Sequence, residues 1–149
     1  MLPTTGFTCS ASSEYGLDFT CNNSYDSNSG VGWATKNEGT GAWIEIQLPE
    51  YVQLGKIKTR HRFGGRYSGV NFNDIKLSFS DGTVQSARLK DGTDPEWNVI
   101  AIDPSMKTKS IKIAAMSVHE SHVPNPGFSG ISFYSCPGTT QSCSKLNQV

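Results

Sequence analysis

Two runs of alternating side chains, at residues 43–48 and 56–62, constrain the fold of this chain more than any other feature. One face of these runs carries Ile44, Ile46 and Leu48, and then Ile57, Thr59 and His61. The opposite face of the second run carries Lys56, Lys58, Arg60 and Arg62. Successive side chains of a strand point to opposite faces, so this period of two predicts two half-buried strands. Pro49 and Gly55 lie between the runs and favour a turn or an edge there.

The remaining apolar runs also predict short strands separated by turns. They are residues 75–79, 84–89, 97–102, 110–118 and 131–134. The Asp81-Gly82 dipeptide between the first two of these is typical of a hairpin, because Asp and Gly tolerate positive φ angles. Residues 1–42 are polar and are expected to be irregular. Roughly eight short strands with this spacing predict an all-β fold and are typical of a β-sandwich.

Length and charge limit the possible functions. The 149 residues suit one domain, and we expect residues 137–149 to form a tail after it. The 13 basic residues balance the 13 acidic ones, so net charge gives no argument for binding nucleic acid or an anionic membrane. No apolar run is long enough for a transmembrane helix, and the first residues lack the basic and apolar parts of a signal peptide.

The four cysteines lie near the two ends of the sequence, at Cys9, Cys21, Cys136 and Cys143. No CxxC pair is present, so two disulfides are favoured over a zinc site. We expect at least one bridge between the N-terminal segment and the end of the last strand, with a local Cys136–Cys143 bridge as the main alternative. Disulfides and the glycosylation sequon at residues 22–24 both favour a secreted protein.

Several short motifs occur in an order that resembles one known family. They are Tyr25-Asp26, Trp33, Gly41-x-Trp43-Ile44-Glu45-Ile46, the strand from Ile57 to Arg62, Ile75-x-Leu77-Ser78-x-Ser80-Asp81-Gly82, and Gly127-Phe128-Ser129 with Ile131-x-Phe133-Tyr134-x-Cys136. This order resembles the discoidin family, which includes the coagulation-factor type C domains and many galactose-binding-like carbohydrate-binding modules. The resemblance covers residues 7–136, the expected domain, and implies an antiparallel jelly-roll β-sandwich with its termini together at one end. It also implies ligand-binding loops at the opposite end, for terminal sugars, anionic lipid head groups or protein.

Many members of this family hold a structural calcium beside those loops. The resemblance places Asp26 near such an ion, and the oxygen-rich segment around it adds Asn23 and Ser29 as candidate ligands. Two departures weaken this site, because Val31 replaces a frequent Thr and Gly130 replaces a frequent Glu. The alternative interpretation is an ordinary turn rich in Asn, Asp and Ser.

The cationic cluster at the end of the second strand is the main candidate for ligand binding. In the family, an Arg at this strand end and another in the next loop often contact ligand, and Arg62 and Arg66 match that arrangement. Guanidinium groups suit sugar hydroxyls, carboxylates and phosphates. Further candidates beside them are Arg60, Phe63 and Tyr67. His61 shares the phase of the apolar face, which favours a buried, hydrogen-bonded supporting role over direct contact. The alternative for the whole cluster is a solvated strand edge.

The sequence therefore predicts a secreted, lectin-like carbohydrate-binding module that is not an enzyme. It contains no GxSxG nucleophile motif, and His119 and His122 flank Glu120 in a proline-containing loop rather than a metal-binding helix. The fucose-binding branch of the family uses an Arg-x-Asp motif, and no Asp follows Arg60 or Arg62 at that spacing. The alternatives are a phospholipid- or protein-binding adhesion domain and an accessory domain of a larger secreted protein.

Overall fold

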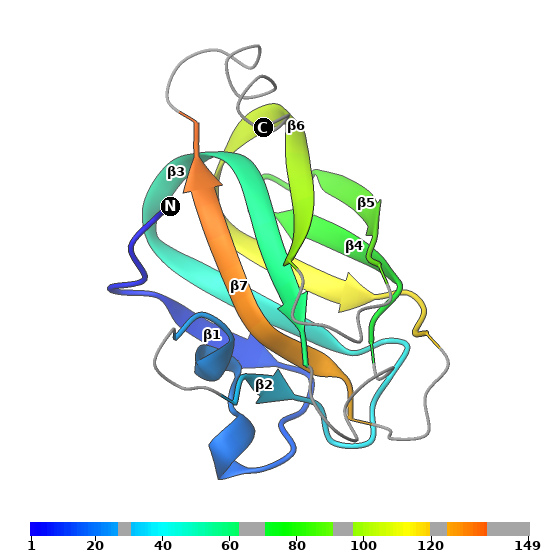
Figure 1. Ribbon diagram of the computed structural model, residues 1–149. Helices are drawn as coiled ribbons and strands as arrows, with labels where there is room; N and C mark the ends of the chain where they lie inside the picture. Colours follow the sequence, from blue (N-terminus) through cyan, green and yellow to red (C-terminus); the bar gives the residue numbers. More distant parts are fainter. Residues whose placement is uncertain (27–30, 63–70, 91–96, 120–124, 137–149) are drawn as a thin grey trace.

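Seven strands and two short 3-10 helices make up the described part of the chain (Figure 1). The computed structural model describes residues 1–26, 31–62, 71–90, 97–119 and 125–136. The strands are β1 (Thr8–Ala11), β2 (Trp33–Ala34), β3 (Trp43–His61), β4 (Asp74–Phe79), β5 (Val84–Arg88), β6 (Trp97–Ala115) and β7 (Gly127–Ser135). The 3-10 helices are η1 (Leu17–Phe19) and η2 (Cys21–Ser24). Among the described residues, no helix has the length and apolar character needed to cross a bilayer.

The strands β3 and β6 are each 19 residues long and arch from one layer of the molecule to the other (Figure 1). They pair with each other on both sides of the arch, Trp43 opposite Ala114 and Arg60 opposite Trp97. The prediction of separate short strands was therefore wrong at these two places. The register shifts around residues 47–56 show why, because the Pro49 to Gly55 segment bends a continuous strand instead of ending it.

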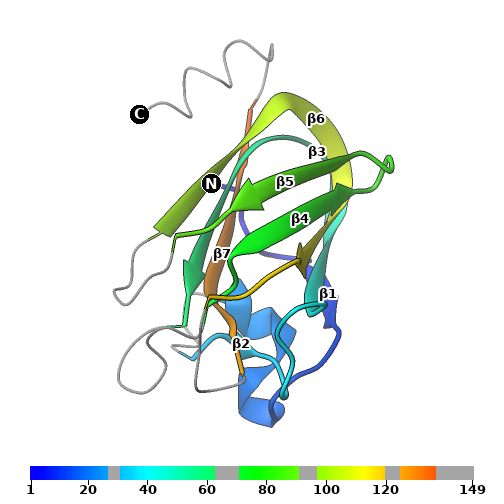
Figure 2. The same cartoon turned by 90° about the vertical axis from the view of Figure 1, so that its right-hand side faces the viewer.

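The two halves of these arched strands belong to two layers of an antiparallel sandwich. In one layer, the first half of β3 pairs with β1 and with the second half of β6, and β4 and β5 follow. In the other layer, the second half of β3 lies between β7 and the first half of β6, and β2 flanks β7. Figure 2 turns the molecule so that β4 and β5 face the viewer. Every strand pair is antiparallel, so the predicted antiparallel β-sandwich is confirmed.

The core lies between the two layers and contains the side chains that the alternation predicted. Ile44, Ile46 and Ile57 are fully buried. At the end of the sandwich where β3 ends and β7 begins, Trp33 contacts the rings of Phe72 and Phe128, with centroids 6.0 and 6.1 Å away. The Asp81-Gly82 hairpin between β4 and β5 is also as predicted, with Gly82 at a φ of 89°. Alternation therefore identified the buried face correctly even where it misplaced the strand ends.

The N-terminal region is more ordered than its polar sequence predicted. The short strand β1 adds to β3 with Cys9 opposite Ile46. The backbone N–H of Leu2 donates to the carbonyl of Phe133 at 2.8 Å, so the chain start lies beside the last described strand. The N-terminal segment, which was expected to be irregular, therefore adds β1 to the layer that contains the first half of β3. Its first residues lie beside β7 in the other layer.

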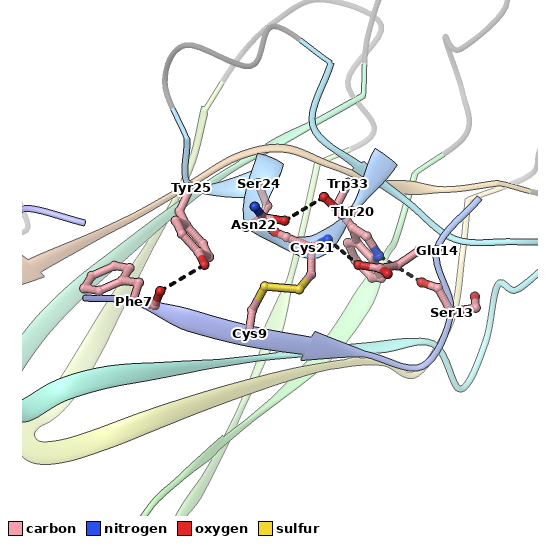
Figure 3. Close-up of a disulfide and its surroundings, with 10 residues drawn as sticks. All are labelled: Phe7, Cys9, Ser13, Glu14, Thr20, Cys21, Asn22, Ser24, Tyr25 and Trp33. Carbon is pink, nitrogen blue, oxygen red and sulfur yellow. Dashed lines mark hydrogen bonds between the residues drawn. A yellow bond between two sulfur atoms is a disulfide. The ribbon is translucent and has the colours of Figure 1, made fainter. Parts of the chain in front are cut away.

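A disulfide between Cys9 and Cys21 attaches η2 to β1 (Figure 3). The predicted bridge from the N-terminal segment to the end of the last strand was therefore wrong, because both N-terminal cysteines pair with each other. Cys136 is also disulfide-bonded, and no cysteine of the described residues is free. The alternative Cys136–Cys143 pairing falls on a segment outside the described residues. Glu14 supports the observed bridge by accepting the backbone N–H of Cys21 at 2.6 Å.

Replacing both Cys9 and Cys21 by serine is expected to lower the free energy of unfolding. The bridge closes a loop with a sequence separation of 12 residues. A loop of this length restricts the unfolded chain enough to contribute about 3 kcal/mol. Chemical denaturation of the double variant and the wild-type protein measures this difference. An unchanged denaturation midpoint would show that the bridge adds no stability.

Candidate functional site

A hollow of about 550 Å³ lies along β7, between the N-terminal residues and the outward side of β3. Its walls come from distant parts of the sequence. They include residues 1–4, the Tyr25–Asp26 pair after η2, and Lys58 and Arg60 of β3. Trp97, the first residue of β6, closes the end nearest the loops. The volume falls in the range of small-molecule binding sites.

Arg60 and Trp97 form the best-defined part of this hollow. They are facing partners in the β3–β6 pairing, and the Arg60 guanidinium lies 4.8 Å from the centre of the indole ring. Arg60 Nε also donates to Ser129 Oγ at 3.0 Å, and that hydroxyl donates to the carbonyl of His61 at 2.8 Å. Trp97 is 39% exposed, so an aromatic surface with a positioned cation faces solvent.

Gly130 explains how the Trp97 ring reaches across the sheet. It lies opposite Arg60 on the other side of β3. A Cβ atom at this position would collide with the Trp97 ring. Because Gly130 has no side chain, the indole of Trp97 lies directly over it.

Lys58 and Tyr134 continue the site away from Trp97. Lys58 pairs with Ser132 across β3 and β7, and Lys56 pairs with Tyr134. The Lys56 and Lys58 amines lie 4.4 and 5.1 Å from the centre of the Tyr134 ring. Contacts of this kind keep the amines over the ring while leaving N–H groups for a ligand.

Tyr25 and Asp26 also line the hollow. The Tyr25 hydroxyl donates to the carbonyl of Phe7 at 3.3 Å (Figure 3). Burial, and then the nearby Asp26 carboxylate, raise the pKa of Tyr25. The hydroxyl therefore stays protonated at neutral pH, and Asp26 adds an exposed carboxylate to the lining.

The predicted calcium ligands are only partly within the described residues. Asn23 directs its side-chain amide to the carbonyl of Asp18 at 2.8 Å, and Ser29 lies outside the described residues. Gly130 contributes no carboxylate, and the described part of the chain contains no cluster of three His, Cys, Asp or Glu side chains. The calcium site stays a prediction.

His61 and Arg62 are buried, and each forms a hydrogen bond with a backbone carbonyl of a distant segment. His61 is 2% exposed, and its Nε2 is 2.8 Å from the carbonyl of Lys90, to which it donates. Arg62 is 5% exposed and donates from Nη1 to the carbonyl of Asn125 at 2.8 Å. The prediction that Arg62 shares the exposed face of Arg60 was wrong. A register shift between Arg60 and His61 breaks the alternation there, and β3 ends at His61.

The remaining predicted ligand contacts, Phe63, Arg66 and Tyr67, lie outside the described residues. Sequence reasoning named Arg60 but missed the other groups that the structure brings to it. These are Lys58, Trp97, Tyr25 and Tyr134. Lys58 was visible in the alternation beside Arg60. Trp97 could be recognised only from its place opposite Arg60, which depends on the pairing of strands far apart in sequence.

Comparison with known proteins identifies the family. The model of the F5/8 type C domain family matches residues 7–127. The chain belongs to this family. The discoidin resemblance is therefore confirmed, and so is the galactose-binding-like jelly-roll sandwich that it implied. No curated protein matches the sequence of this F5/8 type C domain.

Solved structures similar to this F5/8 type C domain are distant in sequence but alike in fold. A family 32 carbohydrate-binding module of C. perfringens NanJ, solved with galactose, has 16% identity, covers 89% of this chain and 96% of its own, and has a TM-score of 0.73. An F5/8 type C domain from Bacteroides fragilis has 16% identity, covers 90% and 94%, and has a TM-score of 0.75. A fucose-binding module of Streptococcus pneumoniae has 18% identity, covers 88% and 95%, and has a TM-score of 0.64.

Proposed function

We propose that this F5/8 type C domain binds a carbohydrate in the hollow at Trp97 and Arg60. The observation that carries the proposal is the half-exposed Trp97 ring with the Arg60 guanidinium 4.8 Å from its centre, at the rim of a cavity of about 550 Å³. Sugars have apolar faces that stack on aromatic rings and hydroxyls that need several hydrogen-bond partners. Trp97 offers the aromatic ring for stacking, and Arg60 offers hydrogen-bond donors for the hydroxyls.

The other groups of the hollow suit the same kind of ligand. Lys58 donates hydrogen bonds, Asp26 accepts them, and the Ser132 hydroxyl does either. Donors and acceptors around one aromatic platform match the alternating hydroxyls of a sugar better than they match an apolar ligand. Three of the structurally similar proteins are described as complexes with glycans: galactose, GalNAc-β-1,3-galactose and the Lewis B antigen.

The predicted ligand contacts that follow β3 remain part of the proposal. Phe63, Arg66 and Tyr67 follow β3 directly in the sequence, and we propose that they add contacts beyond Trp97. The buried side chains of His61 and Arg62 support this end of the sandwich through the carbonyls of Lys90 and Asn125. Their role in binding is indirect, because they position the chain and do not face the hollow.

The proposal describes a non-catalytic, extracellular recognition domain. The disulfide Cys9–Cys21 is the feature that supports an oxidising compartment. Binding to anionic lipid or to protein is the competing function.

An Arg60→Ala variant is expected to lose glycan binding. The wild-type protein is first screened on a glycan array. The glycans that bind it are then titrated into the wild-type protein and into the Arg60→Ala variant. Losing a charged hydrogen-bond donor weakens binding about tenfold or more.

Arg88→Ala is the matched control, because Arg88 is an exposed arginine of β5 that pairs with Asp74 away from the hollow. Equal titration curves for Arg60→Ala and wild type would exclude this site. Binding to phosphatidylserine vesicles without binding to any arrayed glycan would favour the lipid alternative.

A further inference from the structure

Three cations form a row on the outward face of β3. Lys56, Lys58 and Arg60 occupy alternate positions of the strand, and all three are partly exposed. Alternate residues of a strand lie about 7 Å apart, so the row presents positive charge over about 14 Å. Only Lys58 and Arg60 line the hollow, so Lys56 extends the row beyond it.

Aromatic rings on the flanking strands hold this row in place. Tyr134 of β7 lies beside Lys56 and Lys58, and Trp97 of β6 lies beside Arg60. The other register neighbours of the two lysines are short: Ser132, Val99 and Ala101. The cations therefore lie partly exposed along the strand, between the Tyr134 ring beside Lys56 and the Trp97 ring beside Arg60.

The ion pairs of the described residues leave the two lysines out. Neither Lys56 nor Lys58 forms an ion pair within the described residues, where the observed salt bridge joins Arg88 to Asp74. Asp26 is the one acidic side chain among the described residues that line the hollow. The chain as a whole has no net charge, so this row is a local concentration of positive charge.

We propose that the carbohydrate is acidic: a linear polysaccharide whose repeated carboxylate or sulfate groups bind along Lys56, Lys58 and Arg60. This inference rests on the proposed carbohydrate-binding function and specifies its ligand class. A single anion would contact one or two of the cations, whereas a chain with repeated charges can contact all three. The row follows the direction of a strand on a sheet face, which suits an extended chain lying beside Tyr134 and ending at Trp97. Cations surrounding a loop tip would suit a membrane surface better.

The test uses polygalacturonate and dextran sulfate as probes, with neutral dextran for comparison. The variant Lys56→Gln/Lys58→Gln removes two cations of the row. Its matched control is Lys76→Gln/Lys112→Gln, which removes two outward lysines from the other layer, one of them 4.5 Å from the ring of Trp43. Titration calorimetry measures the binding of each probe to each protein.

The wild-type protein is expected to bind at least one acidic probe more tightly than dextran. The Lys56→Gln/Lys58→Gln variant is expected to bind that probe about fivefold more weakly, since each exposed ion pair contributes a modest amount. The control double variant is expected to match wild type. Binding of the acidic probe should also weaken as salt is added, because screening shortens the range of surface charges.

Two results would overturn the acidic-ligand inference alone. One is equal affinity of wild type and Lys56→Gln/Lys58→Gln for the acidic probe. The other is binding of neutral glycans, lost in the Arg60→Ala variant, without binding of either acidic polysaccharide. A wild-type protein that binds neither acidic nor neutral glycans would overturn the proposed function as well. Binding to phosphatidylserine vesicles or to DNA, but not to the acidic polysaccharides, would also contradict the inference.

Discussion

Replacing Trp33 by alanine is expected to lower the free energy of unfolding by about 3–5 kcal/mol, the largest stability effect that we predict. Trp33 is fully buried and contacts Phe72 and Phe128 at the loop end of the core. Its indole N–H donates to the carbonyl of Ser13 at 3.0 Å. Alanine would leave a cavity between these rings and would leave the Ser13 carbonyl without this donor. Chemical denaturation measures the loss, which is a large fraction of the stability of a typical domain.

The Trp33→Phe variant separates packing from hydrogen bonding. Phenylalanine keeps most of the buried ring but cannot donate to Ser13, so its cost should be about 1–3 kcal/mol. This variant also provides a measurement if Trp33→Ala does not fold. A loss below about 1 kcal/mol for Trp33→Ala would contradict the central place given to this side chain in the core.

Replacing Trp97 by alanine is expected to abolish most carbohydrate binding. The Trp97 ring is the one exposed tryptophan surface among the described residues that line the hollow, and it carries the stacking contact with Arg60. An aromatic side chain that a ligand covers on binding contributes at least about 2 kcal/mol, which corresponds to a loss of roughly thirtyfold in affinity when it is removed. Calorimetric titration with the tightest ligand from the glycan array measures this loss.

Trp43→Ala is the matched control for Trp97→Ala. Trp43 is also a partly exposed tryptophan beside a cation, with the Lys112 amine 4.5 Å from the centre of its ring. It begins β3 in the other layer and does not line the hollow. We expect Trp43→Ala to bind the ligand as wild type does. Comparable losses in both variants would mean that the effect comes from general destabilisation and not from the site.

Local alternation predicted the faces of the long strands but not their continuity. Ile44, Ile46 and Ile57 face the core as expected, because a strand face is fixed by a period of two. Whether Pro49 and Gly55 end a strand or bend it depends on a partner strand far away in sequence, which here is β6. The short β1 was missed for a similar reason, since it is held by the edge of β3 and by the Cys9–Cys21 bridge.

The candidate site was predictable only where its residues share one strand. Lys58 and Arg60 appear together in the sequence, and the structure keeps them together. Alternation alone assigns Arg62 to the same face, but the register shift after Arg60 places its side chain in a buried position. Trp97 comes to Arg60 through the β3–β6 pairing, a contact that no local pattern encodes.

The indole N–H signals of the three tryptophans give the most direct test of the proposed site. Trp33 is buried in the core, Trp43 lies on the other layer, and Trp97 lies on the rim of the hollow. In an NMR titration with the best ligand from the glycan array, we predict that the Trp97 signal shifts with ligand concentration. The Trp33 and Trp43 signals should stay in place. Saturable binding with an unmoved Trp97 signal would contradict the account.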